Sequence, residues 1–280
     1  MAMVGCSSVK NSAFLFPFEE NGKFGYKNVR GEFVVDPKFT EARWFENGLA
    51  SVKVGDKFGY IDKSGLLVIR PQFDFASTFQ EGLASVKVFK KWGFIDLAGK
   101  FVVEPKFDLI YDFKDGVAAV NIGHEEWKRG LHGHPLMTGK WGLIDRTGKY
   151  LVEPKFDEVE AYSHYGVTFE EGLARVRIGR KWGFIDRGGN TVVEPQFDSV
   201  LNFSGGLAAV WVGQKCGFID KTGKVIIPPQ FDGCSSFYEG EAFINLGHKP
   251  TDGLPSTKGP SRGRYGYVNK AGDVRWVDSD

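Results

Sequence analysis

The sequence predicts an all-β protein built from tandem repeats, and three observations support this prediction. Nearly the same eighteen residues occur at 91–108, KWGFIDLAGKFVVEPKFD, and at 181–198, KWGFIDRGGNTVVEPQFD. Short segments alternate between apolar and polar residues with a period of two, which is typical of β-strands. Between these segments Asp-x-x-Gly recurs, and this combination of residues is typical of a tight turn.

One recurring glycine aligns the repeats along the whole chain. It lies at positions 25, 59, 93, 142, 183, 217 and 266, so the spacings are 34, 34, 49, 41, 34 and 49 residues. The basic period is therefore 34 residues, with insertions of 15, 7 and 15 residues near 123–139, 160–168 and 247–263. A fixed period of this length indicates a repeat architecture. We predict a flexible N-terminus over 1–12 and a single domain of seven units over 13–280.

Each unit is predicted to contain three short strands, which we call A, B and C. In the third unit strand A covers 82–88, strand B covers 91–96 and strand C covers 100–103. The chain opens with a strand A at 13–16 and closes with a strand C at 274–277. The end units depart from the consensus, as the capping units of repeat proteins commonly do.

The residues around strand C have predictable roles. Asp96 is expected to cap the turn between strands B and C, and Gly99 to take its left-handed position. Pro105 has no N–H to donate, so it is predicted to end strand C. Phe107 follows two residues later, as an equivalent phenylalanine does in five other units, and is predicted to fill the seam between neighbouring units.

Composition excludes several classes of protein. The chain has 280 residues, of which 42% are hydrophobic and 15% aromatic, enough to form a packed core. It has 36 Lys and Arg against 35 Asp and Glu, and a net charge of +1 provides no field for nucleic acid. No apolar run approaches the roughly 18 residues that a membrane span needs. We therefore predict neither a nucleic-acid partner nor a membrane span.

The cysteines leave the cellular location open. There are three, Cys6, Cys216 and Cys234, and an odd number without a CxxC motif indicates neither a disulfide framework nor a zinc ribbon. Cys216 is expected to be a buried, small apolar residue. Cys6 lies in MVGCSS, which resembles the stretch around the lipidated cysteine of bacterial lipoproteins, although the charged and apolar parts of a signal are missing. The alternatives are a cytoplasmic protein and an exported lipoprotein with a trimmed signal.

The repeated motifs resemble a known family. Lys-Trp-Gly-Phe-Ile-Asp, Asp-x-x-Gly, Pro-x-Phe-Asp and Glu-Gly-Leu-Ala follow in this order, as in the WG (also called KWG) repeat family of bacterial β-repeat proteins. The resemblance covers roughly residues 13–280 and implies an all-β repeat array without an enzymatic signature. Cys216 replaces the tryptophan, and Asn28 and Asn269 replace the turn aspartate. Asparagine tolerates the same turn.

Two architectures stay open for the seven units: a superhelical, solenoid-like β array and a closed seven-bladed propeller-like ring. Propeller repeats usually have about 40 to 50 residues and four strands, whereas 34 residues supply three strands and at most a short fourth in the linker. Both long insertions fall in A–B connections three units apart, and they begin alike, with NIGH at 121–124 and NLGH at 245–248. We favour the superhelical array.

The inserted segments hold the candidate binding residues. All five histidines lie there: His124, His132, His134, His164 and His248. Imidazole is a common metal ligand, but a repeated consensus that excludes histidine would also leave it to irregular segments. We adopt this second explanation and predict no metal. Trp127 lies among charged residues, and an aromatic residue in such a loop is a candidate binding anchor.

The aromatic and acidic repeat positions are predicted to be structural. Trp92, Trp141 and Trp182 precede Gly93, Gly142 and Gly183 at one repeat position, so core packing is favoured over a stacking ladder for sugars. Each Asp-x-x-Gly turn supplies one carboxylate, too few for a calcium loop. The sequence contains no Gly-x-Ser-x-Gly motif, phosphate loop or dinucleotide fingerprint. We therefore predict no catalytic residues and no cofactor.

The sequence favours a non-enzymatic repeat scaffold that binds a protein through its extended surface and inserted loops. One alternative is a carbohydrate- or cell-wall-binding module, which exposed aromatics on the outer face in at least three units would favour. Another is a metal-dependent enzyme that uses the histidines of the inserted loops. The sequence leaves the oligomeric state open.

Overall fold

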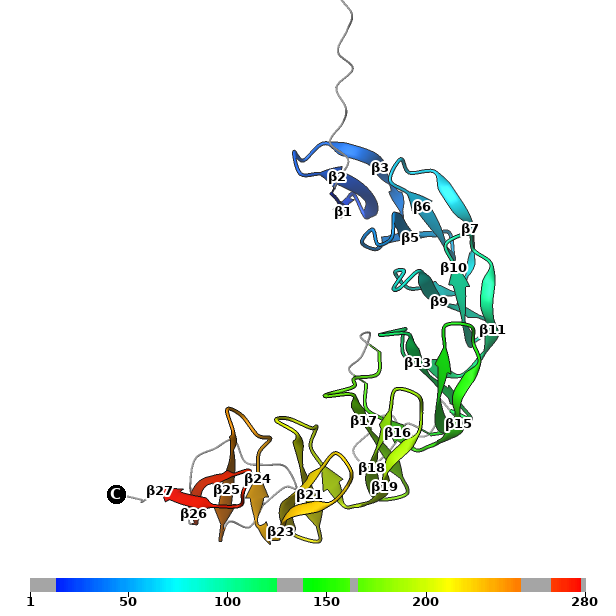
Figure 1. The fold of residues 1–280 in the computed structure, drawn as a ribbon. Coiled ribbons are helices and arrows are strands. Elements are labelled where there is room, and N and C mark those ends of the chain that lie inside the picture. The colour runs from blue at the N-terminus through cyan, green and yellow to red at the C-terminus, as the bar shows by residue number, and fades with distance from the viewer. Residues whose placement is uncertain (1–13, 125–137, 162–165, 248–262, 278–280) are drawn as a thin grey trace, which may run out of the picture. The chain divides into compact units, whose positions relative to one another are not determined.

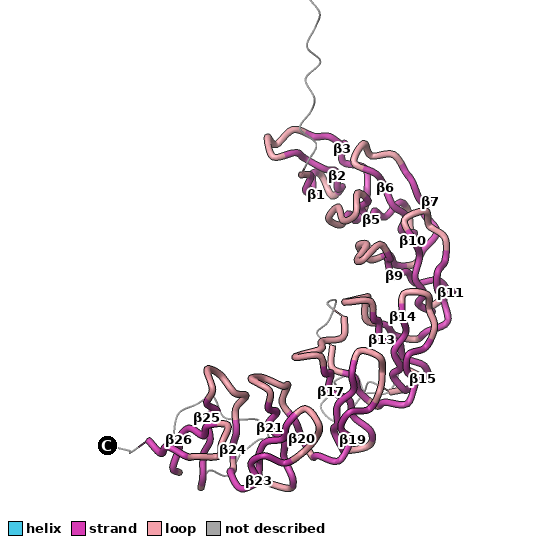
Figure 2. The backbone as a smooth tube through the Cα atoms, viewed as in Figure 1, coloured by secondary structure: helices cyan, strands magenta, loops and turns pink. Residues whose placement is uncertain are grey.

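The structure is a computed structural model that describes residues 14–124, 138–161, 166–247 and 263–277. These residues form strands, turns and loops and contain no helix (Figure 2). The strands make seven small antiparallel sheets, one after another along the chain (Figure 1). The prediction of an all-β tandem array is therefore confirmed.

Each sheet is built from strands in chain order. The first three sheets contain β1 (Leu15–Glu20), β2 (Lys23–Asn28) and β3 (Phe33–Phe39); β4 (Glu41–Ala42), β5 (Leu49–Val54), β6 (Lys57–Asp62) and β7 (Leu67–Phe73); and β8 (Phe75–Ala76), β9 (Leu83–Val88), β10 (Lys91–Asp96) and β11 (Phe101–Phe107). The next two contain β12 (Leu109–Ile110), β13 (Val117–Ile122), β14 (Lys140–Asp145) and β15 (Tyr150–Phe156); and β16 (Glu158–Val159), β17 (Leu173–Ile178), β18 (Lys181–Asp186) and β19 (Thr191–Phe197). The last two contain β20 (Ser199–Val200), β21 (Leu207–Val212), β22 (Lys215–Asp220) and β23 (Val225–Phe231); and β24 (Gly233–Cys234), β25 (Glu241–Leu246), β26 (Arg264–Asn269) and β27 (Val274–Val277).

The strand boundaries confirm most of the predicted repeat. Strands A, B and C are present in every sheet, and a short fourth strand of two residues precedes strand A in the second to seventh sheets. This short strand comes from the linker, as the 34-residue period allowed. The predicted opening strand at 13–16 is misplaced, because β1 begins at Leu15 and its pairing with β2 continues to the turn at Asn21 and Gly22.

The prediction that proline ends strand C is wrong. In the third sheet β11 runs through Pro105 to Phe107, and Phe107 pairs with Trp92 after register shifts relative to Val103. Two features make the proline tolerable: strand C is the edge strand of its sheet, and the shifts form a bulge. The missing N–H is therefore not required by a neighbouring strand.

The turns follow the predicted chemistry. In the second sheet the Asp62 carboxylate accepts hydrogen bonds from the backbone N–H groups of Ser64 and Leu66, at 2.8 and 3.1 Å. Gly65 has a φ of +86° and donates to the Asp62 carbonyl. This is the cap and left-handed glycine expected for Asp-x-x-Gly.

The core lies between successive sheets. In one cluster Tyr60, Ile69 and Phe73 of the second sheet meet Val86 and Ile95 of the third. Equivalent clusters join the first sheet to the second, the fifth to the sixth and the sixth to the seventh. The phenylalanine after the proline is buried in each of these clusters. The prediction that it fills the seam between units is confirmed.

By its internal contacts the chain divides into two compact parts, which are larger than the repeat units. One contains residues 1–116 and 146–148, and the other contains residues 117–145 and 149–280. Each is a stack of sheets of the kind described above. The choice between an open superhelix and a closed ring depends on how these two parts are placed. The superhelical array therefore stays a prediction. The described part of the chain includes no helix suited to crossing a membrane.

Candidate binding surface at the A–B turns

Most of the binding residues proposed from sequence lie outside the described residues. These are Trp127, His132, His134, His164 and His248, and Cys6 lies outside as well. His124 is described: it is half-buried after β13, and its Nδ1 is 3.5 Å from the Thr138 hydroxyl. The described residues contain no group of three or more His, Cys, Asp or Glu that could hold a metal.

The glycine of each repeat is required by a close approach of two strands. A Cβ atom on Gly93 would lie 2.4 Å from the Val103 carbonyl oxygen, and one on Gly183 would lie 2.3 Å from that of Val193. Gly142 has the same relation to Val152, at 2.5 Å. The bulge at the proline brings strand C this close, so only glycine fits at this position of strand B.

The tryptophans before these glycines pack against the array. Trp141 is buried, while Trp92 and Trp182 are half-buried. The ring of Trp92 meets that of Phe75 at a centroid distance of 5.3 Å, and Trp182 packs on the cluster that includes Val200. The assignment of these three positions to core packing stays a prediction.

A second aromatic pair recurs that the sequence interpretation missed. The residue after the repeat glycine packs on a phenylalanine of its own linker, as in Tyr60–Phe79 and Phe218–Phe237, with centroids 4.8 and 4.9 Å apart. This phenylalanine lies 20 residues after the glycine in five units, at positions 45, 79, 113, 203 and 237. The recurrence of phenylalanine 20 residues after the repeat glycine was the sequence signal that could have predicted this pair.

Charges that recur from repeat to repeat join neighbouring sheets at the A–B turns. The lysine that begins strand B pairs with the aspartate of Pro-x-Phe-Asp, 17 residues later. The pairs are Lys57–Asp74, Lys91–Asp108, Lys140–Asp157, Lys181–Asp198 and Lys215–Asp232. In four of them the other carboxylate oxygen accepts the N–H of a residue in the next A–B turn, namely Phe89, Gly179, Gly213 and Gly247. We call this arrangement the Lys–Asp clasp.

The clasp holds its aspartate in the charged form. The hydrogen bond from the Lys181 ammonium and the N–H of Gly213 lower the pKa of Asp198, and the same contacts from Lys57 and Phe89 lower the pKa of Asp74. A carboxylate that accepts charged and backbone donors is stabilised in its ionised form. Each clasp therefore fixes the start of one A–B turn through a charge at the end of the preceding unit.

The third A–B turn departs from the others. Gly55, Gly179 and Gly213 begin three of these turns with φ values of +61°, +62° and +62°. In the third sheet the turn residues are Phe89 and Lys90, with φ values of +45° and +67°. Hairpin turns with positive φ strongly favour glycine, asparagine and aspartate, and a bulky residue there is an outlier.

Phe89 is also the most exposed large hydrophobic residue among those described. Its exposed fraction is 88%, although its N–H is held by Asp74 at 2.8 Å. The backbone is therefore fixed while the phenyl ring extends into solvent. Sequence alignment of the units could have found this residue, because it directly follows strand A, at a position where five other units have glycine.

The other exposed aromatic residues do not form a repeated surface. They are Phe14, Phe18, Trp44, Tyr238, Phe243 and Tyr267, and each occupies a different position relative to the glycine of its unit. Within the described residues, no repeat position exposes an aromatic side chain in three units. The condition that would favour a carbohydrate-binding module is therefore not met there.

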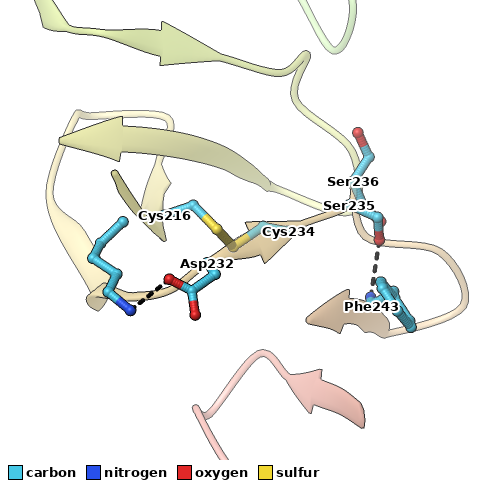
Figure 3. The surroundings of a disulfide bond; sticks show 7 residues. Cys216, Asp232, Cys234, Ser235, Ser236 and Phe243 are labelled. Carbon is cyan, nitrogen blue, oxygen red and sulfur yellow. Dashed lines mark hydrogen bonds and ion pairs between the residues drawn. A yellow bond between two sulfur atoms is a disulfide. The ribbon is translucent and has the colours of Figure 1, made fainter. Parts of the chain in front are cut away.

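The prediction for the cysteines is wrong. Cys216 and Cys234 form a disulfide, with a Cα–Cα distance of 6.2 Å and a sequence separation of 18 residues (Figure 3). Cys216 is buried as expected, but as half of a cross-link. The odd cysteine count concealed the pair, because Cys6 accounts for the third cysteine. Cys216 precedes the repeat glycine, and Cys234 lies 18 residues later. The equivalent residues of the fifth unit, Trp182 and Val200, pack together, and this spacing was the sequence signal for the disulfide.

The sheets, seams and clasps together define a tandem β-repeat protein of the class built from short antiparallel sheets. The model of the family described as "WG containing repeat" matches residues 24–58, 58–91, 92–123, 141–182, 182–216 and 217–249. The chain belongs to this family of WG-containing repeat proteins. A search of curated proteins finds no match.

Solved structures resemble the chain only distantly. Kluyveromyces lactis Hsv2p is 10% identical, with 94% of each chain covered and a TM-score of 0.38. A eukaryotic initiation factor is 12% identical, with 93% of this chain and 84% of that chain covered and a TM-score of 0.35. The C-terminal WD40 domain of Sif2 is 10% identical, with 91% and 78% covered and a TM-score of 0.34. Scores this low carry no argument about fold or function.

Proposed function

We propose that this chain is a non-enzymatic repeat scaffold that binds a protein partner through the A–B turn at Phe89. The observation that carries the proposal is an 88% exposed phenyl ring on a backbone with a φ of +45°. Such a conformation costs about 1 to 3 kcal/mol in a residue other than glycine, and residues of this kind cluster at functional sites. The fold does not need the ring, because glycine serves in the equivalent turns.

The exposed ring has the properties of a binding anchor. Aromatic residues that insert into a pocket of the partner contribute a large share of the energy of protein interfaces. The hairpin and the clasp at Asp74 hold the backbone of Phe89 before binding, which reduces the backbone entropy lost in the complex. Lys90 is exposed beside it, so the expected partner surface is an apolar pocket with an acidic rim.

Photo-cross-linking tests this proposal. A photoreactive phenylalanine analogue is placed at position 89 of the full chain, and in a matched control at position 238, where Tyr238 is 77% exposed near a different turn. After irradiation in cells that contain the chain naturally, cross-linked proteins are identified by mass spectrometry. We expect one dominant protein adduct at 89 that is missing at 238. The same adducts at both positions, or none at 89, would contradict the proposal.

The carbohydrate alternative makes a different prediction. If the chain bound a polysaccharide, the protein adduct at position 89 would be missing and binding to cell-wall fragments would persist in Phe89→Gly. The alternative of a metal-dependent enzyme is tested by metal analysis of the untagged protein. Less than about a tenth of an equivalent of metal would exclude a resident catalytic ion, since a resident metal binds near one per site.

A further inference from the structure

The disulfide joins two different sheets. Cys216 lies in β22 of the sixth sheet, where it pairs with Trp211 and Phe231. Cys234 lies in β24, which pairs with β25 and belongs to the seventh sheet. Both cysteines are buried, with exposed fractions of 0% and 4%. The bond therefore crosses the seam between the two sheets.

The repeat itself places these two positions in contact. Cys216 precedes the repeat glycine, and Cys234 lies 18 residues later. In the fifth unit the same positions hold Trp182 and Val200, which pack in one cluster. In the second unit they hold Phe58 and Ala76, also in one cluster. A contact that is apolar in other units is thus covalent in the sixth.

The surroundings hold the two cysteines in register. Lys215 directly precedes Cys216, and its ammonium lies 2.7 Å from the Asp232 carboxylate, two residues before Cys234. Asp232 also accepts the N–H of Gly247 at 2.7 Å, so the clasp and the disulfide reinforce the same seam. Tyr267 of the seventh sheet is 36% exposed, whereas the equivalent Phe218 of the sixth sheet is fully buried.

We infer that the Cys216–Cys234 bond is a covalent staple that holds the seventh sheet on the sixth, and that the chain acquires it in an oxidising compartment. Disulfides persist in secreted and periplasmic proteins and are rare in the cytosol. A cross-link between two sheets limits how far they can separate when one of them unfolds locally, and so stabilises the folded arrangement. The exported alternative raised by the MVGCSS stretch requires a compartment of this kind as well.

Formation of the bond needs an oxidant, and a protein or small-molecule disulfide supplies the required chemistry. The thiolate of one cysteine attacks a sulfur of the oxidant and releases one of its thiolates, which gives a mixed disulfide. The second cysteine thiolate then attacks the chain's sulfur in that mixed disulfide and releases the oxidant's other thiolate. The two cysteines lose two protons and two electrons, and the oxidant is reduced to two thiols.

The first test measures the oxidation state of the chain. The full chain carrying Cys6→Ser is purified from the oxidising compartment of its host and treated with an alkylating reagent without reductant. We expect no alkylation and a single cross-linked peptide pair containing Cys216 and Cys234. Two alkylated cysteines would overturn the inference.

The second test measures what the bond holds. Hydrogen exchange is compared between oxidised protein and protein that has been reduced in urea and refolded with reductant. We expect exchange in β24–β27 to be at least about tenfold faster after reduction, since the sheet then opens locally, while β9–β11 stay unchanged. Equal exchange in β24–β27 before and after reduction would contradict the staple.

A matched variant separates loss of the bond from a direct effect of the reductant. Cys216→Trp with Cys234→Val introduces the residues that the fifth unit carries at these positions. Its exchange in β24–β27 should not respond to the reductant, because it has no bond to lose. A response equal to that of the native chain would show that the reductant acts elsewhere and would also overturn the inference.

Discussion

At the scale of single residues, the repeat glycine is the strictest requirement of the fold. Gly93→Ala would place a methyl group 2.4 Å from the Val103 carbonyl oxygen, and strand C would have to move. We expect a loss of about 3 kcal/mol of unfolding free energy, at the upper end of the range for overpacking. Urea unfolding monitored by tryptophan fluorescence measures this loss.

The control for this variant is Gly116→Ala. Gly116 has a φ of +80°, and a Cβ atom added to it would have no neighbouring atom within 4 Å. Only the left-handed backbone therefore disfavours alanine there, by about 1 kcal/mol of unfolding free energy. Equal losses in the two variants would show that backbone conformation alone, and not the approach of strand C, selects the glycine.

At its position in the third A–B turn, Phe89 is expected to make the fold less stable than glycine would. Phe89→Gly removes a bulky residue from a left-handed turn, and we expect the free energy of unfolding to rise by about 1 kcal/mol. The reciprocal change is Gly179→Phe. A Cβ atom at position 179 would have no neighbouring atom within 4 Å, so the added ring meets no clash and should lower the free energy of unfolding by a similar amount, through the left-handed backbone alone. Thermal unfolding of both variants measures the difference. A destabilised Phe89→Gly would show that the ring serves the fold.

At the scale of elements, the Lys–Asp clasps make the seams sensitive to acid. The folded pKa of Asp198 is lowered from its ordinary value of 3.8, chiefly by the hydrogen bond from Lys181. A lowered folded pKa contributes stability that is present above the unfolded pKa and is lost as pH falls through the folded pKa. The clasps should therefore weaken below about pH 4.

Asp198→Asn isolates this contribution. The variant should be less stable than the native chain at pH 7. The difference should shrink as pH falls below about 4 and should disappear only once the pH is below the lowered folded pKa of Asp198, where the native carboxylate is protonated. Urea midpoints between about pH 2.5 and 7 measure it. A difference that does not change with pH would mean that the variant acts through packing instead of charge.

Strand C shows which parts of an element the sequence predicts and which it does not. Its length was underestimated because Pro105 was treated as a stop, whereas a proline on an edge strand can lie within a bulge. The seam residue Phe107 was assigned correctly, since its recurrence after the proline indicates a shared packing position. The Lys–Asp clasp was not predicted, because residues 17 apart in sequence meet only once the strands have paired.

At the scale of the whole molecule, recurrence marks structure and departure from recurrence marks candidate function. Glycines, phenylalanines and clasps recur because the described seams repeat the same packing problem, as in other arrays stabilised by neighbouring repeats. Phe89 and the pair Cys216–Cys234 occur once each, and neither is needed by the other seams. The sequence alone shows that these residues depart from the consensus, but exposure and contact distances are needed to tell an anchor from a staple.

The most direct test of the account is the dissociation constant of the partner identified at position 89, measured with the purified full chain. Phe89→Gly should weaken binding by about 10- to 30-fold, as expected for loss of an aromatic hot spot. The control Tyr238→Ser should leave the constant within about twofold, since a residue outside the binding surface contributes little. An unchanged dissociation constant in Phe89→Gly would contradict the claim that this turn is the binding surface.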